Sequence, residues 1–194
     1  SESELSLAVA AALTDFVNAG SDVFLMHGNR DFLLGLSFAR SCCATLLQEP
    51  HVIESQAGPI LLMHGDALCT DDVDYQKFRK LVREPAWQEN FLAQPLAQRK
   101  AFAEQARAQS ALATAGKVSE IMDVNAAAIE QSLSAAGTST LLHGHTHRPA
   151  IHPLTTLAGL RIVLGDWDKR GWYAETSVDG VALHEFEFGS LSGI

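Results

Sequence analysis

Three histidines alternate directly after a short apolar run in this chain of 194 residues. His143, His145 and His147 follow residues 140–142, which read Thr-Leu-Leu. Alternate residues of an extended segment point to the same side, and neutral imidazole is the commonest metal ligand in proteins. We therefore expect a strand that delivers imidazoles to a metal at its end. The alternative is a histidine-rich turn on the surface.

Two other apolar runs end in turns of the same kind. Residues 24–26 lead into His27-Gly28-Asn29, and residues 60–63 lead into His64-Gly65-Asp66. Glycine lets the backbone turn sharply and approach a ligand closely. The carboxyl ends of neighbouring strands meet at one crevice in layered α/β proteins. We predict that the three turns gather around one site.

Four motifs, at residues 27–33, 63–72, 121–125 and 143–149, resemble the signatures of calcineurin-like metallophosphoesterases. More closely, they resemble the family that hydrolyses the pyrophosphate of UDP-2,3-diacylglucosamine in lipid A synthesis. Arg30 stands where the wider superfamily usually has histidine, which favours the lipid branch. The resemblance runs from about residue 5 to about residue 188. It implies an α/β fold, a four-layer αββα sandwich with a helical cap.

The resemblance also implies the site. It assigns Asn29, His64 and His145 to one divalent metal and His147 to a second, and mixed nitrogen and oxygen ligands favour Mn²⁺. Arg30 is the expected catalytic residue, since its guanidinium suits phosphoryl oxygens; a plain surface role is the alternative. The expected substrate-binding residues are Asn29, Arg30, Asp72, Tyr75, Arg107, Ser110, Thr114, Lys117 and His145. Thr114 stands where asparagine is common in the family, and a solvated polar face is the alternative for the last positions of this set.

The first motifs of the family are missing from the chain. Such enzymes begin with Asp-x-His and Gly-Asp strand ends, yet no aspartate here is followed at the second position by histidine. A strand–helix–strand unit takes about 30 residues or more. We therefore expect an N-terminally truncated piece of a longer protein, with an exposed sheet edge. A gene product that lacks half the metal site is the alternative. Two Mn²⁺ ions would bind when the N-terminal ligands are present.

Charge is distributed unevenly along the chain. The net charge of −9 argues against a nucleic-acid partner. Residues 73–120, however, hold eight of the fourteen basic residues against five acidic ones, so this segment is net +3 and the rest net −12. A basic helical insertion with interspersed aromatic residues indicates a lid that faces lipid or the inner-membrane surface. An ordinary amphipathic helical pair is the alternative.

Localisation follows from what the sequence lacks. We find no apolar run near the ~18 residues that span a bilayer and no basic signal-peptide start. Cys42, Cys43 and Cys69 show no metal-type spacing, which indicates a reducing compartment. We expect a cytoplasmic protein, peripheral on the inner face of the inner membrane. The sequence makes no prediction of oligomeric state.

The layout predicts one domain with a lid at about residues 73–120. We predict helices over residues 5–19, 31–41, 72–82 and 117–136, with Asp31 as a cap and breaks at Pro85, Pro95 and residues 114–116. Strands are predicted over residues 23–26, 46–47, 51–55, 60–63, 138–142, 150–154, 160–164, 172–177 and 181–188.

The implied reaction is Mn²⁺-dependent release of UMP and 2,3-diacylglucosamine 1-phosphate from the lipid-linked UDP-sugar. The alternatives are a metallophosphoesterase for another nucleotide diphosphate and a non-catalytic, lipid-binding remnant. The acyl-chain preference is not predicted.

Overall fold

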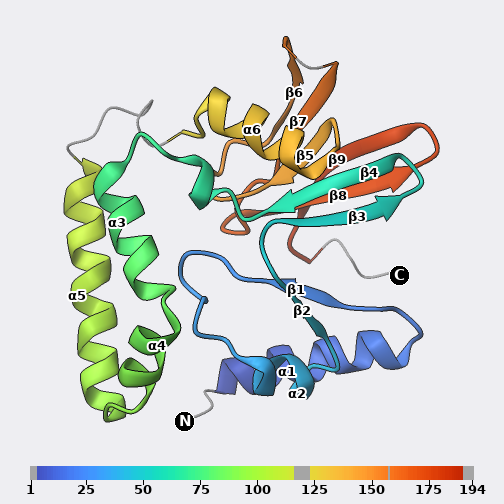
Figure 1. Ribbon diagram of the computed structural model, residues 1–194. Helices are drawn as coiled ribbons and strands as arrows, with labels where there is room; N and C mark the ends of the chain where they lie inside the picture. Colours follow the sequence, from blue (N-terminus) through green and yellow to red (C-terminus); the bar gives the residue numbers. More distant parts are fainter. Residues whose placement is uncertain (1–3, 116–122, 157, 190–194) are drawn as a thin grey trace. The chain divides into compact units, whose positions relative to one another are not determined.

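A computed structural model describes residues 4–115, 123–156 and 158–189. The chain forms two compact units, each built from two separate stretches of sequence (Figure 1). Unit 1 comprises Ser1–Leu47 and Asp71–Met122, and unit 2 comprises Gln48–Thr70 and Asp123–Ile194. Helices and a mixed sheet make the fold α/β, as predicted. The single domain stays a prediction.

Unit 2 is organised around a five-stranded sheet with the order β3-β4-β5-β7-β6. The three middle strands run parallel, and β3 and β6 are antiparallel edge strands. This arrangement puts the carboxyl ends of β4 and β5 beside each other. The strands are β3 (His51–Ser55), β4 (Gly58–Met63), β5 (Thr140–His143), β6 (Ala150–Leu154) and β7 (Gly159–Val163).

Helix α6 (Ala126–Ala136) covers the middle of this sheet (Figure 1). Its Ile129 and Leu133 pack in one buried cluster with Leu61 of β4 and Leu141 of β5. Each fully buried aliphatic side chain contributes about 2 kcal/mol to stability. Packing and strand pairing together therefore hold β4 and β5 in place.

The C-terminal strands β8 (Arg170–Ser177) and β9 (Gly180–Glu187) pair as a separate antiparallel hairpin. Gly180 has φ of +126°, which glycine tolerates at the turn. The ring of Phe186 lies over Gly171, where a Cβ atom would come within 2.1 Å of it. Glycine at residue 171 therefore makes room for an aromatic ring on the facing strand.

The first part of unit 1 is α1 (Glu4–Asn18), β1 (Phe24–Met26), α2 (Leu36–Ser41) and β2 (Thr45–Leu47). β1 and β2 pair in parallel, and no other strand of the described residues joins them. The expected free sheet edge stays a prediction. Phe24 of β1 is 57% exposed, because a two-stranded sheet gives it little cover.

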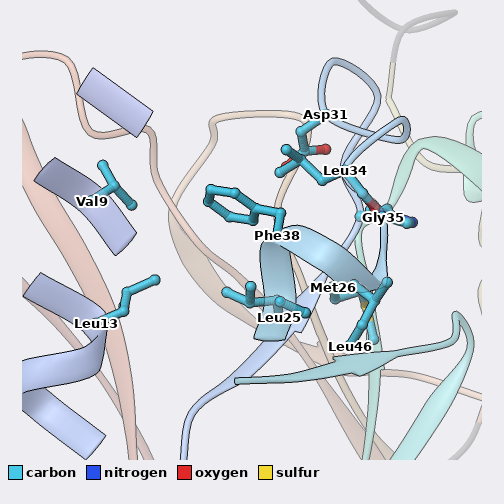
Figure 2. A pocket seen from close by; sticks show the side chains of 11 residues that line it. Val9, Leu13, Leu25, Met26, Asp31, Leu34, Gly35, Phe38 and Leu46 are labelled. Atoms are coloured by element: carbon cyan, nitrogen blue, oxygen red, sulfur yellow. The ribbon is translucent and has the colours of Figure 1, made fainter. Parts of the chain in front are cut away.

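An apolar pocket of about 220 Å³ lies within this part of unit 1. Figure 2 shows Val9 and Leu13 of α1 on one side, facing Leu25, Phe38 and neighbouring side chains across the hollow. The elements of this part of the chain are therefore incompletely packed against one another.

The predicted lid is helical as far as residue 115. It consists of α3 (Val73–Val82), α4 (Pro85–Leu92) and α5 (Leu96–Ala115). Pro85 occupies the first turn of α4 and Pro95 precedes α5, as their predicted role as breaks requires. Trp87 and Phe91 of α4 stack on each other, and Phe102 of α5 contacts both rings at an angle, with ring centroids 5.7 and 5.1 Å away. None of the described helices is both long and apolar enough to cross a bilayer.

One predicted helix start is wrong, and a second predicted helix is shorter than expected within the described residues. Asp31 does not cap a helix, because its Oδ1 accepts the backbone N–H of Gly28, and α2 begins only at Leu36. The last predicted helix covers residues 117–136. Residues 117–122 lie outside the described residues, and residues 123–125 are not helical. α6 begins at Ala126, because the Asn125 side chain accepts the N–H groups of the next turn and is a strong cap.

Candidate metal centre

Two of the three predicted turns meet in unit 2. Met63 of β4 is in register with His143 of β5, so the residues that follow these strands lie side by side. The Gly144 N–H donates to the His64 carbonyl oxygen at 2.9 Å. The His64 and His145 rings then lie with centroids 5.1 Å apart and planes at 67°. Metal–imidazole bonds are about 2 Å long, so these two rings are close enough to share one cation.

Gly65 makes this approach possible. Its φ is +114°, a conformation that side chains rarely adopt. A Cβ atom there would lie 2.8 Å from Nδ1 of His143 and 3.1 Å from the Gly144 carbonyl oxygen. The glycine of the His-Gly-Asp motif is thus required by both its backbone and its surroundings.

The histidine motif does not continue as a strand, which corrects the expected alternation. β5 ends at His143, and His145 and His147 have positive φ values of 66° and 54°. The Thr146 N–H donates to the Gly144 carbonyl oxygen at 2.8 Å and closes a tight turn. A left-handed backbone costs about 1 kcal/mol at a residue with a side chain. Such strain often accompanies functional positions.

His143 is the buried member of the three. It is 1% exposed, and its Nδ1 lies 2.9 Å from the Gly144 carbonyl oxygen, to which a protonated Nδ1 donates. Burial lowers the pKa of His143 to about 4, so the ring is neutral near pH 7. These features indicate a packing role.

His145 is held in the form that binds metals. Burial, and then the neighbouring His64 ring, lower its pKa to about 4. Asp66, which is fully buried, acts in the opposite direction on this pKa. Two imidazoles, one of them held neutral, are donors that suit a divalent cation.

The sequence analysis did not single out two acidic residues near His64 and His145, which are Asp66 and Glu49. Asp66 belongs to the His-Gly-Asp motif, so its place after a strand was a usable signal. Glu49 accepts the backbone N–H of His64 at 2.8 Å through Oε1. No motif marks Glu49, which reaches this position only through the fold.

His147 has a different neighbour. Its Nδ1 lies 3.5 Å from Oδ2 of Asp166, and both side chains are about half exposed. Among the described residues, no three His, Cys, Asp or Glu side chains gather closely enough to hold a metal. The residues of unit 2 therefore fit half of a metal site, built around His64 and His145.

Asp123 anchors the segment that follows the histidines. Its Oδ2 lies 2.8 Å from Nη1 of Arg148, and its Oδ1 lies 3.7 Å from Nη1 of Arg161. The Arg161 side chain is 15% exposed, and burial lowers its pKa. A single carboxylate thus faces two guanidinium groups, one just before β6 and one within β7.

The other predicted site residues belong to unit 1. Asn29 is half-buried and Arg30 exposed in the loop that follows β1. Asp72 caps α3 by accepting the Tyr75 N–H at 3.1 Å, which brings these two residues together. Arg107 and Ser110 are exposed on α5, Thr114 is in the same helix, and Lys117 lies outside the described residues. The role of each stays a prediction, as does that of His147.

Comparison with known proteins gives a consistent result. No protein-family model matches the chain. A protein of Cellvibrio japonicus named UDP-2,3-diacylglucosamine hydrolase is 50% identical over 182 residues, which cover 93% of this chain and 76% of the relative. Proteins of the same name from Hahella chejuensis and Pseudomonas fluorescens SBW25 are 46% and 43% identical, over 94% and 93% of the chain and 75% and 73% of the relatives. The chain, a hydrolase, belongs to the UDP-2,3-diacylglucosamine hydrolase family.

Proposed function

We propose that the protein uses Mn²⁺ to hydrolyse the pyrophosphate bond of UDP-2,3-diacylglucosamine, releasing UMP and 2,3-diacylglucosamine 1-phosphate. The observation that carries the proposal is the pair of imidazoles, His64 and His145, 5.1 Å apart on a chain that is 50% identical to a hydrolase named for this substrate. The pair lies at the carboxyl ends of neighbouring parallel strands, where ligands of α/β proteins commonly bind.

Asn29, His64 and His145 would hold one Mn²⁺ and His147 the other, with further ligands from outside the described residues. When bound, two such cations activate a water and supply positive charge beside the phosphoryl oxygens. Neutral His145 has the lone pair that a ligand needs, which its lowered pKa of about 4 preserves throughout the physiological range.

The chain's own groups would orient the substrate. The exposed guanidinium of Arg30 would donate to the phosphoryl oxygens and offset the charge that grows on them in the transition state. Water oxygen would join the phosphorus next to uridine, and the bond from that phosphorus to the bridging oxygen would break. The lipid 1-phosphate leaves with the bridging oxygen. Contacts to its sugar and phosphate would come from Asp72, Tyr75, Arg107, Ser110, Thr114 and Lys117.

The cap would bring the protein to the cytoplasmic face of the inner membrane. Residues 73–120 are net +3, and within the cap Leu81 and Leu92 are 49% and 46% exposed. Exposed apolar side chains among basic ones suit an anionic lipid surface. Flotation with anionic vesicles, reversed by high salt, is the expected result, while retention on neutral vesicles alone would contradict this part of the proposal.

A second candidate is a lipid-binding remnant without catalysis. It is favoured by the absence, among the described residues, of any group of three acidic, cysteine or histidine side chains suited to a metal. Metal analysis separates the two, because two tightly held Mn²⁺ ions per chain would eliminate the remnant.

The test is UMP release from UDP-2,3-diacylglucosamine with and without Mn²⁺. In ¹⁸O-labelled water, we expect the label in UMP and none in the lipid phosphate. A water-soluble UDP-sugar without acyl chains is the matched control and should react far more slowly. Equal rates on both substrates would instead indicate a phosphoesterase for another nucleotide diphosphate.

A further inference from the structure

Arg83 connects two parts of unit 1 that are far apart in the sequence. Arg83 is the C-cap of α3, and its side chain reaches the loop that follows β1. There its Nη2 donates to the Gly28 carbonyl oxygen at 3.0 Å, across 55 positions of sequence. Its guanidinium carbon also lies 5.5 Å from the centre of the Phe32 ring. One half-buried side chain thus contacts the loop at two points.

The two contact points bracket residues of the proposed site. Asn29 and Arg30 lie between Gly28 and Phe32, so an arginine that holds both ends restricts the backbone between them. Neither Asn29 nor Arg30 is in a helix or strand that would hold it by regular backbone hydrogen bonds.

The loop has some internal order of its own. The Gly28 N–H donates to Oδ1 of Asp31, and the Leu34 N–H donates to the Asp31 carbonyl oxygen at 2.8 Å. Its side toward α1 is incompletely packed, because Asp31 and Leu34 line the apolar pocket of about 220 Å³ (Figure 2). The contacts that Arg83 makes with this loop therefore matter more for the position of the loop than its packing against α1 does.

We propose that Arg83 is a positioning residue that ties cap helix α3 to the Gly28–Phe32 loop and thereby sets the place of Asn29 and Arg30. The inference rests on the proposed function, in which these two residues serve metal and phosphate. At its other end α3 begins beside Asp72, eleven residues or roughly 16 Å from Arg83 along the helix. A cap helix that contacts the sugar at its start would thus hold the phosphate-binding loop at its end.

Arginine suits this position for a physical reason. A planar guanidinium can donate in its plane to a carbonyl and at the same time present a face to an aromatic ring. A lysine at residue 83 would keep the charge but could not do both equally well. A methionine would keep much of the length and none of the donors.

The test compares R83M and R83K with K80Q, which removes an exposed charge from the same helix. Hydrogen exchange of the Gly28 and Leu34 amides is measured in the whole chain without substrate. We expect R83M to speed exchange in the loop by roughly tenfold or more, since hydrogen bonds to charged groups are worth that much. R83K should show a smaller increase, and K80Q should match the unsubstituted protein.

Exchange in α6 should not change in any of these variants, which distinguishes a local effect from general unfolding. F32L is the second variant, because it removes only the ring contact and leaves the guanidinium in place. Faster loop exchange in F32L, with no additional increase in R83M/F32L over R83M, would support the coupling. Loop exchange within about twofold of the unsubstituted protein in R83M would overturn it.

Turnover gives a separate answer. Without UMP release from the unsubstituted protein the proposed function fails, and loop exchange alone still decides the role of Arg83. With UMP release, R83M should lower kcat/KM by roughly tenfold. A loosened loop with unchanged turnover would overturn the positioning role.

Discussion

The imidazole pair of unit 2 and the Gly28–Phe32 loop of unit 1 look alike in the sequence but are held in different ways. Each follows an apolar run and begins with a glycine turn. The His64 turn follows a six-residue strand inside a five-stranded sheet, and a main-chain hydrogen bond joins it to Gly144. The loop follows a three-residue strand of a two-stranded sheet and relies on the side chains of Asp31 and Arg83.

This difference shows how the neighbours of a strand determine what its terminal turn can do. Backbone pairing over several strands fixes a position with many weak interactions, so one surface substitution has little effect. A loop that is held by two side chains depends on each of them. We therefore expect the imidazole pair to tolerate changes around it better than the loop does, apart from a few positions in direct contact with the rings.

The largest effect is expected from removing a ring of the pair. His145→Ala should weaken Mn²⁺ binding by more than about 100-fold, because even loss of an outer-shell partner costs 10–100-fold. Titration calorimetry on the whole chain measures this directly. His184→Gln, in the β8–β9 hairpin, is the control and should bind Mn²⁺ normally. Unchanged affinity in His145→Ala would remove His145 from the metal site.

The pH dependence of stability should be the next largest effect and should arise in unit 2. His143 takes up a proton near pH 6.5 when unfolded but near pH 4 when folded, so the unfolded chain binds more protons between these values. The free energy of unfolding should be highest above pH 6.5 and fall by roughly 2–3 kcal/mol as the pH drops to 4.

Urea denaturation across this range measures the decrease, to which His145 contributes in the same direction. His143→Leu should flatten the dependence. An identical slope in that variant would show that His143 does not carry the effect. Exchange at β5 amides should rise on acidification, while exchange at β1 should be much less affected.

Two glycines with positive φ, Gly65 and Gly137, differ in the space around their Cβ positions, so replacing each with alanine separates crowding from backbone strain. Gly65→Ala should destabilise the protein by about 2 kcal/mol, because it combines an unfavourable φ with contacts to His143 and Gly144. Gly137→Ala, with φ of +66° and open space around its Cβ position, should cost only about 1 kcal/mol. Equal midpoints in urea would mean that the crowding at Gly65 relaxes without cost.

The smallest effect is expected in the loop. Asp31→Ala removes the acceptor for the Gly28 N–H and should cost about 1 kcal/mol of local stability. Exchange of the Gly28 amide should speed up, with global unfolding almost unchanged. Asp179→Ala, in the turn between β8 and β9, is a control in unit 2 and should leave the loop unaffected. A large drop in global stability would mean that the loop is more integral to unit 1 than its packing indicates.

Strand positions were largely predictable from the sequence because apolar runs and glycine turns are local signals. β6 matches its predicted range of residues 150–154, and β4 begins only two residues earlier than predicted. The meeting of the turns that follow β4 and β5 was also predicted, from their shared form. Local patterning thus gave half of the candidate metal site, His64 and His145.

The failures involve side chains that had more than one possible partner. Asp31 can cap a helix or hold its own loop, and only the three-dimensional structure shows that it bonds to Gly28. Residues 123–125 were predicted to be helical. They are not, because Asn125 caps the helix that begins at Ala126. The histidine alternation stops at Gly144, where the main chain leaves the strand. Glu49 and Arg83 act through contacts far along the chain, for which no local pattern exists.

Asp123 has a consequence for how this family can change over time. One acid balances two cations, Arg148 and Arg161, of which the second is largely shielded from solvent. Losing the acid alone would remove the carboxylate that faces both guanidinium groups, at a cost that rises with burial. The three positions should therefore covary among descendants of this protein, and a lineage with a neutral residue at 123 should have replaced Arg161 as well.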